Sequence, residues 1–517
     1  MQENLEQKEQ VDLVFISIAS DIQCYNIRRV SAYLKKAGFK TKIIFLPQPF
    51  SKRYSEEVLE QVTVLCKDAR LIGISLMSNY WYNAVQLIKA IRSKHDTPII
   101  GGGSHPSTDP EQCLEETDMI CVGEGDDTLL ELAKRMKEGN ADYSGIPNIW
   151  YKQNGQITKN ESALFEKVDK IPTPDYDLED HHILFKNKVQ PMTVDLFRCF
   201  YGETYSTQFT FGCPYTCSFC IHNIYNKRFK FRFRKRHIKN VLDELSYIKK
   251  KFPFFTQLRI DDDTFFFYSK EEMEYFRDEY KKYVNMPIYV TGGQPMVIKE
   301  ELLRPMVEAG MTKIRMGIES GVERIQEMYQ RRVPNKKILE ACKIINKFKD
   351  LKATYDLILD NPWETEEETI QTLNFILEIP RPFKISLFSL TFYPNTDIHL
   401  KAIADGIVKE NDETIGKHYY SIKNTYLNLM YYICDIRWIP KSLKLFLLKD
   451  NVRNSRFKPV IMFFLRANRI IRGRMGLLKY LLNYAKKLDY VRIRFSIQKF
   501  YYDYRYYYSS KSKVLGS

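Results

Sequence analysis

Apolar runs alternate with helical patterns along residues 11–150. Segments such as 25–38 and 80–94 place apolar side chains every three or four positions, which is typical of amphipathic helices. Between them stand four short runs rich in β-branched residues, at 11–18, 41–46, 70–78 and 97–104. Strands that are apolar on both faces and separated by helices predict a parallel, doubly wound sheet. We therefore expect a Rossmann-like domain over 1–150.

A second alternation begins near residue 206. Six strand-like runs, each followed by a helical pattern, occur at 206–212, 255–263, 287–292, 312–318, 353–360 and 384–393. Six strand–helix units in one row predict a (β/α)6 partial TIM barrel over 206–410. The stretch 151–205 contains the turn dipeptide Asn154-Gly155 and a segment with two prolines, so we expect a linker there. For the remainder, 411–517, we expect a basic and mostly helical region.

Composition narrows the class of protein. Hydrophobic residues make up 44% of the chain and charged residues 28%. The sequence contains no uncharged apolar run long enough to predict a membrane-spanning helix. The first residues are acidic and polar, unlike the basic start of a secretory signal. We expect a globular, cytoplasmic protein, with association with a membrane as an alternative.

The net charge of +15 is concentrated at the C-terminus. From Arg437 onward the chain has 20 Lys and Arg residues against three acids, a local charge of +17 that leaves the remainder at about −2. The segments 438–450 and 458–488 combine these cations with Phe, Leu and Met in basic amphipathic patterns. Such helices either lie on anionic membranes or pack on a domain with a solvated basic face, and both interpretations stay open. The aromatic stretch 500–510 shows no recognisable RNA-binding pattern, so we do not expect nucleic acid as a partner.

Three of the ten cysteines lie together. A reducing cytoplasm argues against disulfides, and the other seven cysteines are scattered singly. Cys213, Cys217 and Cys220 share one loop directly after a predicted barrel strand, in a CxxxCxxC spacing. Structural zinc takes four protein ligands, and His222 could complete such a set only by a cramped turn. Three soft thiolates predict instead a [4Fe-4S] cluster with one iron left open for chemistry.

Ligands bind at the carboxyl ends of the strands in both predicted architectures. In the first domain these loops are rich in glycine and small residues, and they span 17–21, 75–79, 101–106 and 123–126. Backbone can approach a nucleotide-like tail or a phosphate closely there. The same glycines also satisfy ordinary tight turns, so the loops alone do not identify a ligand.

The loop at 213–220 resembles the defining motif of the radical S-adenosylmethionine (radical SAM) family. Four further segments resemble, in register, the DDxF, GIESG, GLPGET and PYPGT motifs of its cobalamin-binding branch, at 260–265, 315–325, 357–369 and 390–402. The segment 99–136 is similar to the cobalamin-binding domain of that branch. The resemblance covers about four fifths of the chain. This chain departs from the branch at glycines of two motifs. Asp360, Asn361 and Trp363 replace them in the segment 357–369, and Asn395 replaces one in the segment 390–402.

The resemblance implies which residues hold the cofactors. The three cysteines would bind the cluster, and contacts to S-adenosylmethionine would come from Phe219, Asp261, Asp262, Arg315, Glu319 and Ser320. Cobalamin would contact Ser17, Ser75, Met77, Ser78, Gly102, Gly103, Ser104, His105, Gly123, Glu124 and Gly125. Arg315, Glu319 and Ser320 could instead cap or pair at the start of the next helix. Similarly, Asp263 could merely shape its turn.

The arginines after the cysteine loop and the histidine of the glycine loop each allow two interpretations. Arg232 and Arg234 resemble a basic RxR of the branch that binds phosphate or carboxylate, unless they form an exposed basic strand. His105 resembles a loop residue near the corrin rather than a cobalt ligand. Many cobalamin domains supply cobalt with the histidine of a DxHxxG loop, but here Asp397-Ile398-His399 lacks the glycine and falls outside that domain. The resemblance therefore implies cobalamin without a protein histidine on cobalt.

The resemblance also implies the activity. Such an enzyme cleaves S-adenosylmethionine reductively at the cluster and most often methylates an unactivated carbon, less often phosphorus. Its partners would be a small-molecule or lipid-like substrate, a reductant protein of the flavodoxin or ferredoxin type, and a peripheral membrane contact through the C-terminal region. A cobalamin-dependent radical SAM cyclase or rearrangement enzyme without net methylation would share every motif. A non-catalytic iron–sulfur or cobalamin sensor is the alternative from another class.

Overall fold

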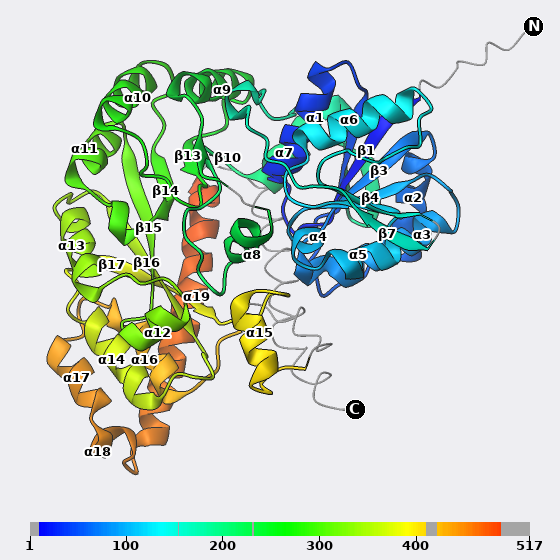
Figure 1. The fold of residues 1–517 in the computed structure, drawn as a ribbon. Helices are drawn as coiled ribbons and strands as arrows, with labels where there is room; N and C mark the ends of the chain where they lie inside the picture. The colour runs from blue at the N-terminus through cyan, green and yellow to red at the C-terminus, as the bar shows by residue number, and fades with distance from the viewer. Residues whose placement is uncertain (1–9, 154, 230–231, 410–420, 487–517) are drawn as a thin grey trace, which may run out of the picture.

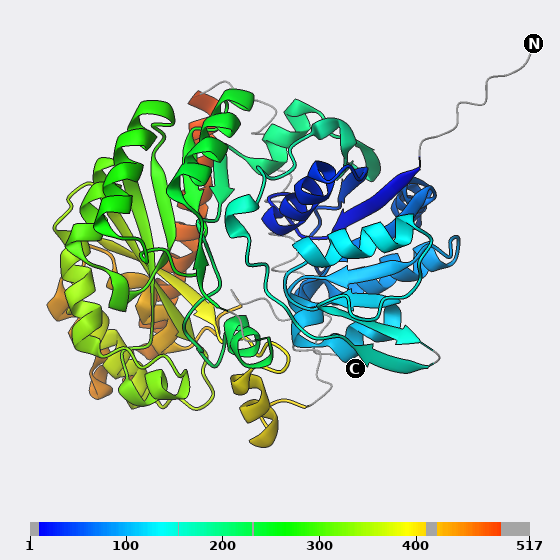
Figure 2. The ribbon, with the colours of Figure 1, turned by 45° about the horizontal axis from the view of Figure 1, so that its top comes forward.

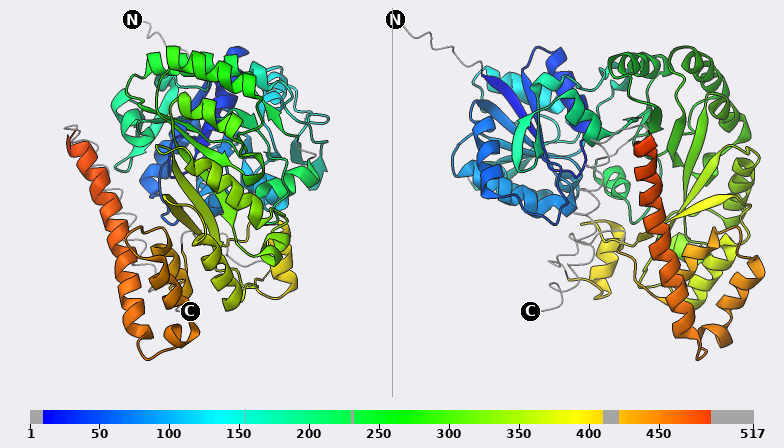
Figure 3. Two further views of the ribbon diagram at one scale, coloured as in Figure 1. Left: turned by 90° about the vertical axis from the view of Figure 1, so that its left-hand side faces the viewer. Right: turned by 180° about the vertical axis from the view of Figure 1, so that it is seen from behind.

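The computed structural model describes residues 10–153, 155–229, 232–409 and 421–486. Figure 1 shows a first lobe in blue and cyan beside a second lobe in green and yellow, whose strands curve into a partial barrel. The C-terminal helices, in orange, lie at the base and along the far side of the second lobe (Figures 1 and 3). The aromatic stretch 500–510 lies outside the described residues.

The first lobe is built on a nine-stranded sheet with the order β7-β6-β5-β4-β3-β1-β2-β8-β9. Its strands are β1 (Val11–Ser17), β2 (Thr41–Phe45), β3 (Ala69–Ser75), β4 (Ile99–Gly102), β5 (Met119–Cys121), β6 (Ile149–Gln153), β7 (Gln156–Lys159), β8 (His181–Phe185) and β9 (Lys188–Pro191). The six central strands are parallel, and β6, β7 and β9 add antiparallel edges. The predicted parallel, doubly wound sheet is confirmed. Its strand order reverses between β1 and β3, the point where such sheets bind ligands.

Helices cover both faces of this sheet. Leu13 and Phe15 of β1 share a core with α1 (Tyr25–Lys36) and α6 (Asp126–Lys137), whereas Val14 and Ile16 face the opposite side. That side is covered by α2 (Glu56–Cys66), α3 (Trp81–Arg92) and α5 (Pro110–Glu116), with the short α4 (Ser104–Thr108) beside them. Because both faces are covered, the strands are apolar throughout, as the sequence pattern predicted.

The segment 151–205, for which the sequence predicts a linker, contributes the two edge strands β7 and β9, and β8 beside β9, to this sheet. β8 pairs in parallel with β2, with His181 opposite Ile43. Just before β8, the buried Asp175 accepts a hydrogen bond from Ser31 Oγ at 2.6 Å and pairs with Lys35 at 3.1 Å. Such long-range polar contacts leave no local pattern in the sequence. α7 (Val194–Tyr201) then leads into the second lobe.

The second lobe contains six parallel strands in the order β10-β13-β14-β15-β16-β17, which confirms the predicted (β/α)6 partial barrel. The strands are β10 (Thr204–Thr207), β13 (Gln257–Ile260), β14 (Ile288–Gly293), β15 (Met311–Glu319), β16 (Lys352–Leu359) and β17 (Phe383–Ser389). A two-stranded ribbon of β11 (Thr210–Phe211) and β12 (Arg234–Lys235) follows the carboxyl end of β10. The helices of this lobe are α8 (Ile221–Arg228), α9 (Ile238–Lys251), α10 (Lys270–Tyr283), α11 (Glu300–Glu308), α12 (Glu323–Met328), α13 (Asn335–Asn346), α14 (Glu366–Ile376) and α15 (Asp397–Ala404).

The C-terminal region is helical, as predicted. Its described residues, 421–486, contain α16 (Tyr426–Cys434), α17 (Lys441–Leu448), α18 (Asp450–Arg453) and α19 (Lys458–Lys486). α16 is buried against α14 and β17, and α19 packs in turn on α16. Within the described ranges, no helix combines the length and hydrophobicity needed to cross a bilayer. None of the ten cysteines, all of which lie in the described ranges, takes part in a disulfide.

Candidate functional site

The cysteine loop lies at the carboxyl end of the barrel, between β11 and α8. Gly212 turns the chain out of β11 with a φ of 80°, and a Cβ there would lie 2.9 Å from the Arg232 carbonyl oxygen. Only glycine fits such a position without displacing backbone. Cys220 is the N-cap residue of α8, and its backbone amide donates to the Cys217 carbonyl at 2.9 Å. The loop therefore starts and ends at fixed points of the barrel.

Two side-chain amides of α8 hold the loop from within. Asn226 Nδ2 donates to the carbonyl oxygens of Cys213 and Tyr215 at 3.0 Å each. Asn223 Nδ2 donates to the Thr216 carbonyl at 3.2 Å. Sequence reasoning missed both asparagines, although their place on the helix that the loop enters was a usable signal.

The loop is also bound to the opposite side of the barrel mouth. The Ser218 amide donates to the Tyr329 carbonyl at 2.9 Å, and Ser218 Oγ donates to the Met328 carbonyl at 2.8 Å. The amide of Ile398 donates to the Ser218 carbonyl at 3.1 Å. Phe219, which the resemblance places near S-adenosylmethionine, packs edge-on against Tyr329 with ring centroids 5.1 Å apart. These contacts hold the middle of the loop against α12 and α15.

The chemistry of the three thiols fits an iron–sulfur cluster. Burial raises the pKa of Cys213, Cys217 and Cys220, and in each case a neighbouring cysteine or acid of the site adds to the rise. Such thiols ionise readily only when a metal supplies compensating positive charge. In the described part of the chain, no three His, Cys, Asp or Glu side chains converge tightly enough to hold a single ion. Three soft thiolates on one short loop fit an iron–sulfur cluster, whereas structural zinc takes four protein ligands.

His222, the candidate fourth ligand of a zinc site, has another partner. Its Nε2 lies 2.9 Å from Asp263 Oδ2, and its ring packs edge-on against Tyr225 at 5.7 Å. Asp263 therefore joins α8 to the loop that follows β13. This contact engages Nε2 of His222, whereas its buried Nδ1 has no hydrogen-bond partner among the described residues.

A buried guanidinium lies beside the loop. Arg331 donates to the Gly317 carbonyl at 2.7 Å and to Gln294 Oε1 at 2.8 Å, and it pairs with Glu319 at 3.4 Å. Burial raises the pKa of Cys217, and the positive charge of Arg331 opposes that rise. Arg331 thus favours the thiolate form of this ligand. Sequence reasoning missed it because an Arg-Arg pair between two helices gives no local sign of burial.

Glu319 folds back over the strand that carries it. Its φ of 68° is a left-handed conformation that is rare for a residue other than glycine. A Cβ on Gly317 would collide with the Glu319 carboxylate, so the glycine makes room for it. Burial raises the pKa of Glu319 to about 7, with Asp356 adding to the rise and Arg331 opposing it. Near neutral pH this carboxyl can therefore hold or release a proton beside the cysteine loop.

Arg315 and Ser320 have partners within the chain. Arg315 Nε donates to the two carboxylate oxygens of Asp356 at 2.8 and 2.7 Å. Ser320 Oγ accepts from the amide of Val322 at 3.2 Å, two residues along the turn into α12, and lies 3.3 Å from Thr372 Oγ1. Arg315 thus forms an ion pair and Ser320 caps a turn, which are the alternatives to contact with S-adenosylmethionine that the sequence left open.

Asp262 lies beneath the cysteine loop. It is 4% exposed and accepts hydrogen bonds from the Phe209 amide at 2.7 Å and from Thr210 Oγ1 at 2.8 Å. Burial raises the pKa of Asp262 to about 8. The neighbouring Asp261 instead accepts from Thr291 Oγ1 at 3.0 Å and faces the gap between the lobes, as described below. Asp262 thus holds the strand from which the cysteine loop emerges.

The predicted cobalamin residues gather at the carboxyl edge of the first sheet. Ser17 and Ser75 end β1 and β3 and lie opposite each other in register, at the point where the strand order reverses. Ser17 Oγ lies 2.8 Å from Cys24 Sγ. In the loop after β3, Met77 is 40% exposed while Ser78 is buried. Met77 is therefore the side chain of this loop most open to a large ligand.

The loop after β4 brings backbone to the surface. Gly103 has a φ of 107°, and a Cβ there would lie 2.8 Å from the Leu76 carbonyl, whereas a Cβ on Gly102 would meet nothing within 4 Å. Ser104 begins α4. His105 is fully buried with its ring 4.9 Å from that of Trp81, and burial lowers its pKa to about 4. A ring enclosed against Trp81 suits a loop residue better than a cobalt ligand.

The loop after β5 is tied to the barrel. Gly123 has a φ of 87°, and Gly125 is the N-cap residue of α6. Between them, both carboxylate oxygens of Glu124 accept hydrogen bonds from Arg234 at 2.7 Å. Glu124 also accepts from the Phe165 amide at 2.8 Å. Arg234 thus binds a carboxylate, as its resemblance to the RxR motif suggested, but the carboxylate belongs to the same chain.

The two predicted cofactor regions share an interface. α8, which follows the cysteine loop, packs against α4, which follows the glycine loop of the first sheet. Figures 1 and 2 show α8 between the two lobes. Ile224 and Phe229 of α8 belong to the core of the first lobe. Asn395, which replaces a family glycine, donates to the Thr108 carbonyl at the end of α4 at 2.7 Å.

Asp360, another departure from the family pattern, joins the barrel to the C-terminal helices. It adopts a φ of 61° and accepts hydrogen bonds from Ser389 Oγ at 2.7 Å and Asn428 Nδ2 at 2.8 Å. The amide of Lys423 donates to the same carboxylate at 3.1 Å. The aspartate keeps the backbone conformation that glycine would adopt and adds an acceptor for α16. The replacement is therefore explained by the C-terminal region.

A cavity of about 230 Å³ lies between the lobes at the carboxyl ends of β1, β10 and β13. Gln23 and Cys24 line it from the first lobe. Arg259 and Asp261 line it from the barrel and pair with each other at 2.6 Å, and Arg259 also donates to Gln23 Oε1 at 2.8 Å. The cavity is therefore polar and lined by residues of both lobes.

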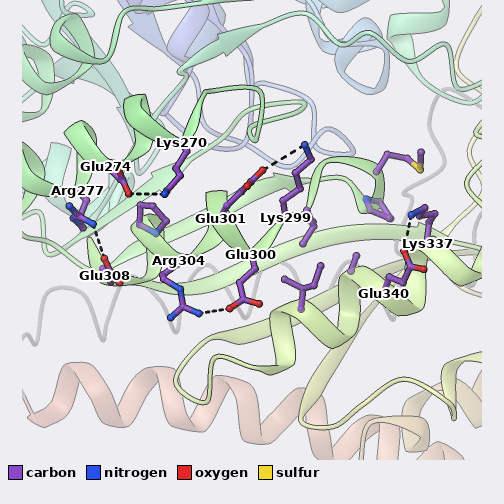
Figure 4. A pocket seen from close by; sticks show the side chains of 16 residues that line it. Lys270, Glu274, Arg277, Lys299, Glu300, Glu301, Arg304, Glu308, Lys337 and Glu340 are labelled. Carbon is purple, nitrogen blue, oxygen red and sulfur yellow. Dashed lines mark hydrogen bonds and ion pairs between the residues drawn. The ribbon is translucent and has the colours of Figure 1, made fainter.

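A larger groove of about 970 Å³ lies elsewhere, on the outer helices α10, α11 and α13. Figure 4 shows that charged side chains line it and pair with one another, among them Arg277 with Glu308 at 3.0 Å and Lys337 with Glu340 at 2.8 Å. None of the predicted cofactor residues lines this groove. Exposed ion pairs of this kind form a solvated surface, and we assign the groove no role in the chemistry.

Comparisons with known proteins match both lobes. The model of the B12 binding domain matches residues 11–133, and that of the radical SAM superfamily matches residues 207–376. An uncharacterized methyltransferase of Pyrococcus horikoshii, PH0819, is 26% identical over 348 residues, which cover 66% of this chain and 71% of that protein.

Two further comparisons concern a cyclase and a solved structure. The anaerobic magnesium-protoporphyrin IX monomethyl ester cyclase of Rubrivivax gelatinosus is 24% identical over 308 residues, which cover 57% of this chain and only 51% of the cyclase. The structure of the cobalamin-dependent S-adenosylmethionine radical enzyme OxsB, with aqua-cobalamin and S-adenosylmethionine bound, aligns with a TM-score of 0.65 at 15% identity. That alignment covers 96% of this chain and 84% of OxsB, so the two proteins share the arrangement of both lobes.

Proposed function

Because this chain belongs to the radical SAM enzymes that carry a cobalamin-binding domain, we propose that it methylates an unactivated carbon of its substrate. In this proposal, Cys213, Cys217 and Cys220 hold a [4Fe-4S] cluster. The carboxyl edge of the first sheet holds cobalamin. When bound, the reduced cluster supplies the electron that cleaves S-adenosylmethionine, and cobalamin carries the methyl group.

One observation carries the proposal. The cysteine loop and the glycine-rich edge of the first sheet are brought together by the packing of α8 against α4. The hydrogen bond from Asn395 to the Thr108 carbonyl closes the same junction. Radical chemistry requires that water be kept from the reacting atoms, and two lobes that pack at their ligand-binding edges can provide that enclosure.

The side chains of the barrel mouth would have distinct tasks. Arg331 would stabilise the thiolate of Cys217 with its buried positive charge. Glu319 would bind the amino group or ribose of S-adenosylmethionine, because its carboxylate lies at the carboxyl end of β15 and titrates near neutral pH. Phe219, Asp261, Asp262, Arg315 and Ser320 complete the proposed set, with the partners described above.

We include partners and location in the proposal. The substrate is a small molecule or a lipid-like compound, and electrons come from a flavodoxin- or ferredoxin-type protein. The enzyme works in the cytoplasm, with a peripheral membrane contact through the basic C-terminal region. The support for this contact is the charge of +17 from Arg437 onward and the basic amphipathic α19.

Product analysis tests the function. The anaerobically reconstituted enzyme is incubated with a reductant, candidate substrates and S-adenosylmethionine whose methyl group is labelled with deuterium. It should form 5′-deoxyadenosine and a product that is heavier than its substrate by one labelled methyl group. The relationship to the Rubrivivax cyclase favours one second candidate, a cobalamin-dependent cyclase or rearrangement enzyme. That enzyme would form 5′-deoxyadenosine without any gain of methyl. Absence of 5′-deoxyadenosine in the presence of a full cluster would contradict both and support a sensor.

A further inference from the structure

α19 carries two apolar faces. One face packs on α16 through Leu465, which is 4% exposed, with Ile461 and Met462 partly buried beside it. The other face is open to solvent, with eight side chains between 44% and 66% exposed: Val460, Phe463, Phe464, Ile470, Ile471, Met475, Leu478 and Leu482. We call these eight residues the α19 stripe.

The α19 stripe is a single face of the helix. Its members are separated mainly by three, four and seven residues, the spacings that place side chains above one another on an α-helix. From Val460 to Leu482 the stripe is about 33 Å long at the usual rise of an α-helix. Figure 3 shows α19 at the outside of the molecule, with its C-terminal half standing away from the barrel. An exposed apolar face of this length, broken only by Arg474 between Ile470 and Leu478 in the described residues, marks an interaction site.

The charges of α19 define what can cover the stripe. The helix contains seven Lys and Arg residues and no acid. Arg472 pairs with Asp435 at 2.7 Å and Arg469 donates to Asn424 at 2.7 Å, so these two cations serve the packed side. The side chains of Arg466 and Arg474 are exposed to solvent. An apolar stripe accompanied by exposed cations matches the boundary between acyl chains and headgroups of an anionic bilayer.

A second copy of the chain fits the stripe less well. Two-fold pairing would place the same cationic helix against itself, since the same patch meets on both subunits. α19 has no acidic residue to compensate that repulsion. A bilayer of anionic lipid supplies the missing negative charge along the whole length of the helix.

We infer that the α19 stripe docks this enzyme on anionic lipid bilayers, with the helix lying in the plane of the interface. The inference rests on the peripheral membrane contact of the proposed function and names the surface that makes it. The docking is peripheral because no helix in the described ranges can span a membrane. It needs no cofactor, so it can be tested separately from the chemistry.

Vesicle flotation of the full-length protein tests the inference. At low salt we expect the protein to float with vesicles of phosphatidylglycerol and phosphatidylcholine, and about tenfold less with pure phosphatidylcholine or in high salt. The variant Phe463→Ser/Ile471→Ser should float at least about tenfold less with the anionic vesicles. Val64→Ser/Val194→Ser, which changes two valines of 65% and 56% exposure outside α19, should float like the wild type. Helical content by circular dichroism should be equal in both variants.

Three outcomes would overturn the inference: absence of flotation with anionic vesicles at low salt, equal flotation of the stripe variant and the wild type, or a lipid-free dimer that the stripe variant converts to a monomer. The last would assign the stripe to a second copy of the chain. Cleavage of S-adenosylmethionine, measured on the same preparations, separates the two proposals. Intact cleavage without flotation contradicts the docking alone, and flotation without cleavage contradicts the proposed chemistry alone.

Discussion

Arg234 and Glu124 join the two lobes through a two-pronged ion pair. Arg234 Nη1 and Nη2 each lie 2.7 Å from a carboxylate oxygen of Glu124, and the two side chains are only 8% and 11% exposed. Arg234 also donates to the Phe165 carbonyl at 2.7 Å. The pair connects the ribbon next to the cysteine loop with the loop after β5. It therefore fixes the distance between the two proposed cofactor sites.

Removing the guanidinium should be costly. Arg234→Ala leaves the buried Glu124 carboxylate without its cation, and we expect a loss of about 3 kcal/mol in the free energy of unfolding. Urea denaturation of the purified protein measures it. Lys337→Ala is the matched control, because its pair with Glu340 is about half exposed and should contribute no more than about 0.5 kcal/mol. Equal losses in the two variants would show that the pair between the lobes is not buried in solution.

Gly317→Ala should impair the binding of S-adenosylmethionine. A Cβ at this position meets the Glu319 carboxylate and comes within 3.0 Å of Arg331 Nη2, so both groups must move. We expect formation of 5′-deoxyadenosine to fall by at least about tenfold, while iron content is unchanged. Gly473→Ala, where a Cβ would meet nothing within 4 Å, is the control. Normal cleavage by Gly317→Ala would argue against a role for Glu319.

Asp262 should make stability depend on pH. Burial raises its folded-state pKa from the usual 3.8 to about 8, so the folded protein keeps this proton to higher pH than the unfolded chain does. The stabilisation is fully present below about pH 4, falls as pH rises, and levels off above about pH 8. Between pH 5 and 8.5, the free energy of unfolding of the wild type should decline by about 4 kcal/mol more than that of Asp262→Asn. Parallel declines would mean that Asp262 is ionised throughout.

Asp360→Gly should loosen the C-terminal helices. The φ of 61° suits glycine, so the variant loses the acceptor for Ser389, Lys423 and Asn428 without straining the backbone. We expect amide exchange in α16 to accelerate by about tenfold or more, as measured by hydrogen–deuterium exchange. Asn285→Gly, at an exposed residue with a φ of 45°, should leave α16 unchanged. Unaltered protection in Asp360→Gly would refute the anchoring role of the aspartate.

Periodicity and spacing predicted the two α/β architectures and the chemistry of the cysteine loop, because these depend on neighbours in sequence. The cores of both lobes follow the same rule, as Leu13 and Val14 show by facing opposite sides of the first sheet. Contacts between distant segments were not predictable. Arg331 reaches Cys217 of the cysteine loop from beyond α12, and β8 pairs with β2 from more than a hundred residues away.

The proposed radical SAM chemistry depends most directly on the metal bound by the cysteine loop. Anaerobic reconstitution followed by measurement of iron, sulfide and zinc should give about four irons per chain in the wild type. Cys217→Ser should retain less than about half of that iron and lose cleavage of S-adenosylmethionine, whereas Cys342→Ser, at a buried cysteine outside the loop, should keep both. One zinc per chain with no iron in the wild type, or full iron and cleavage in Cys217→Ser, would contradict the account.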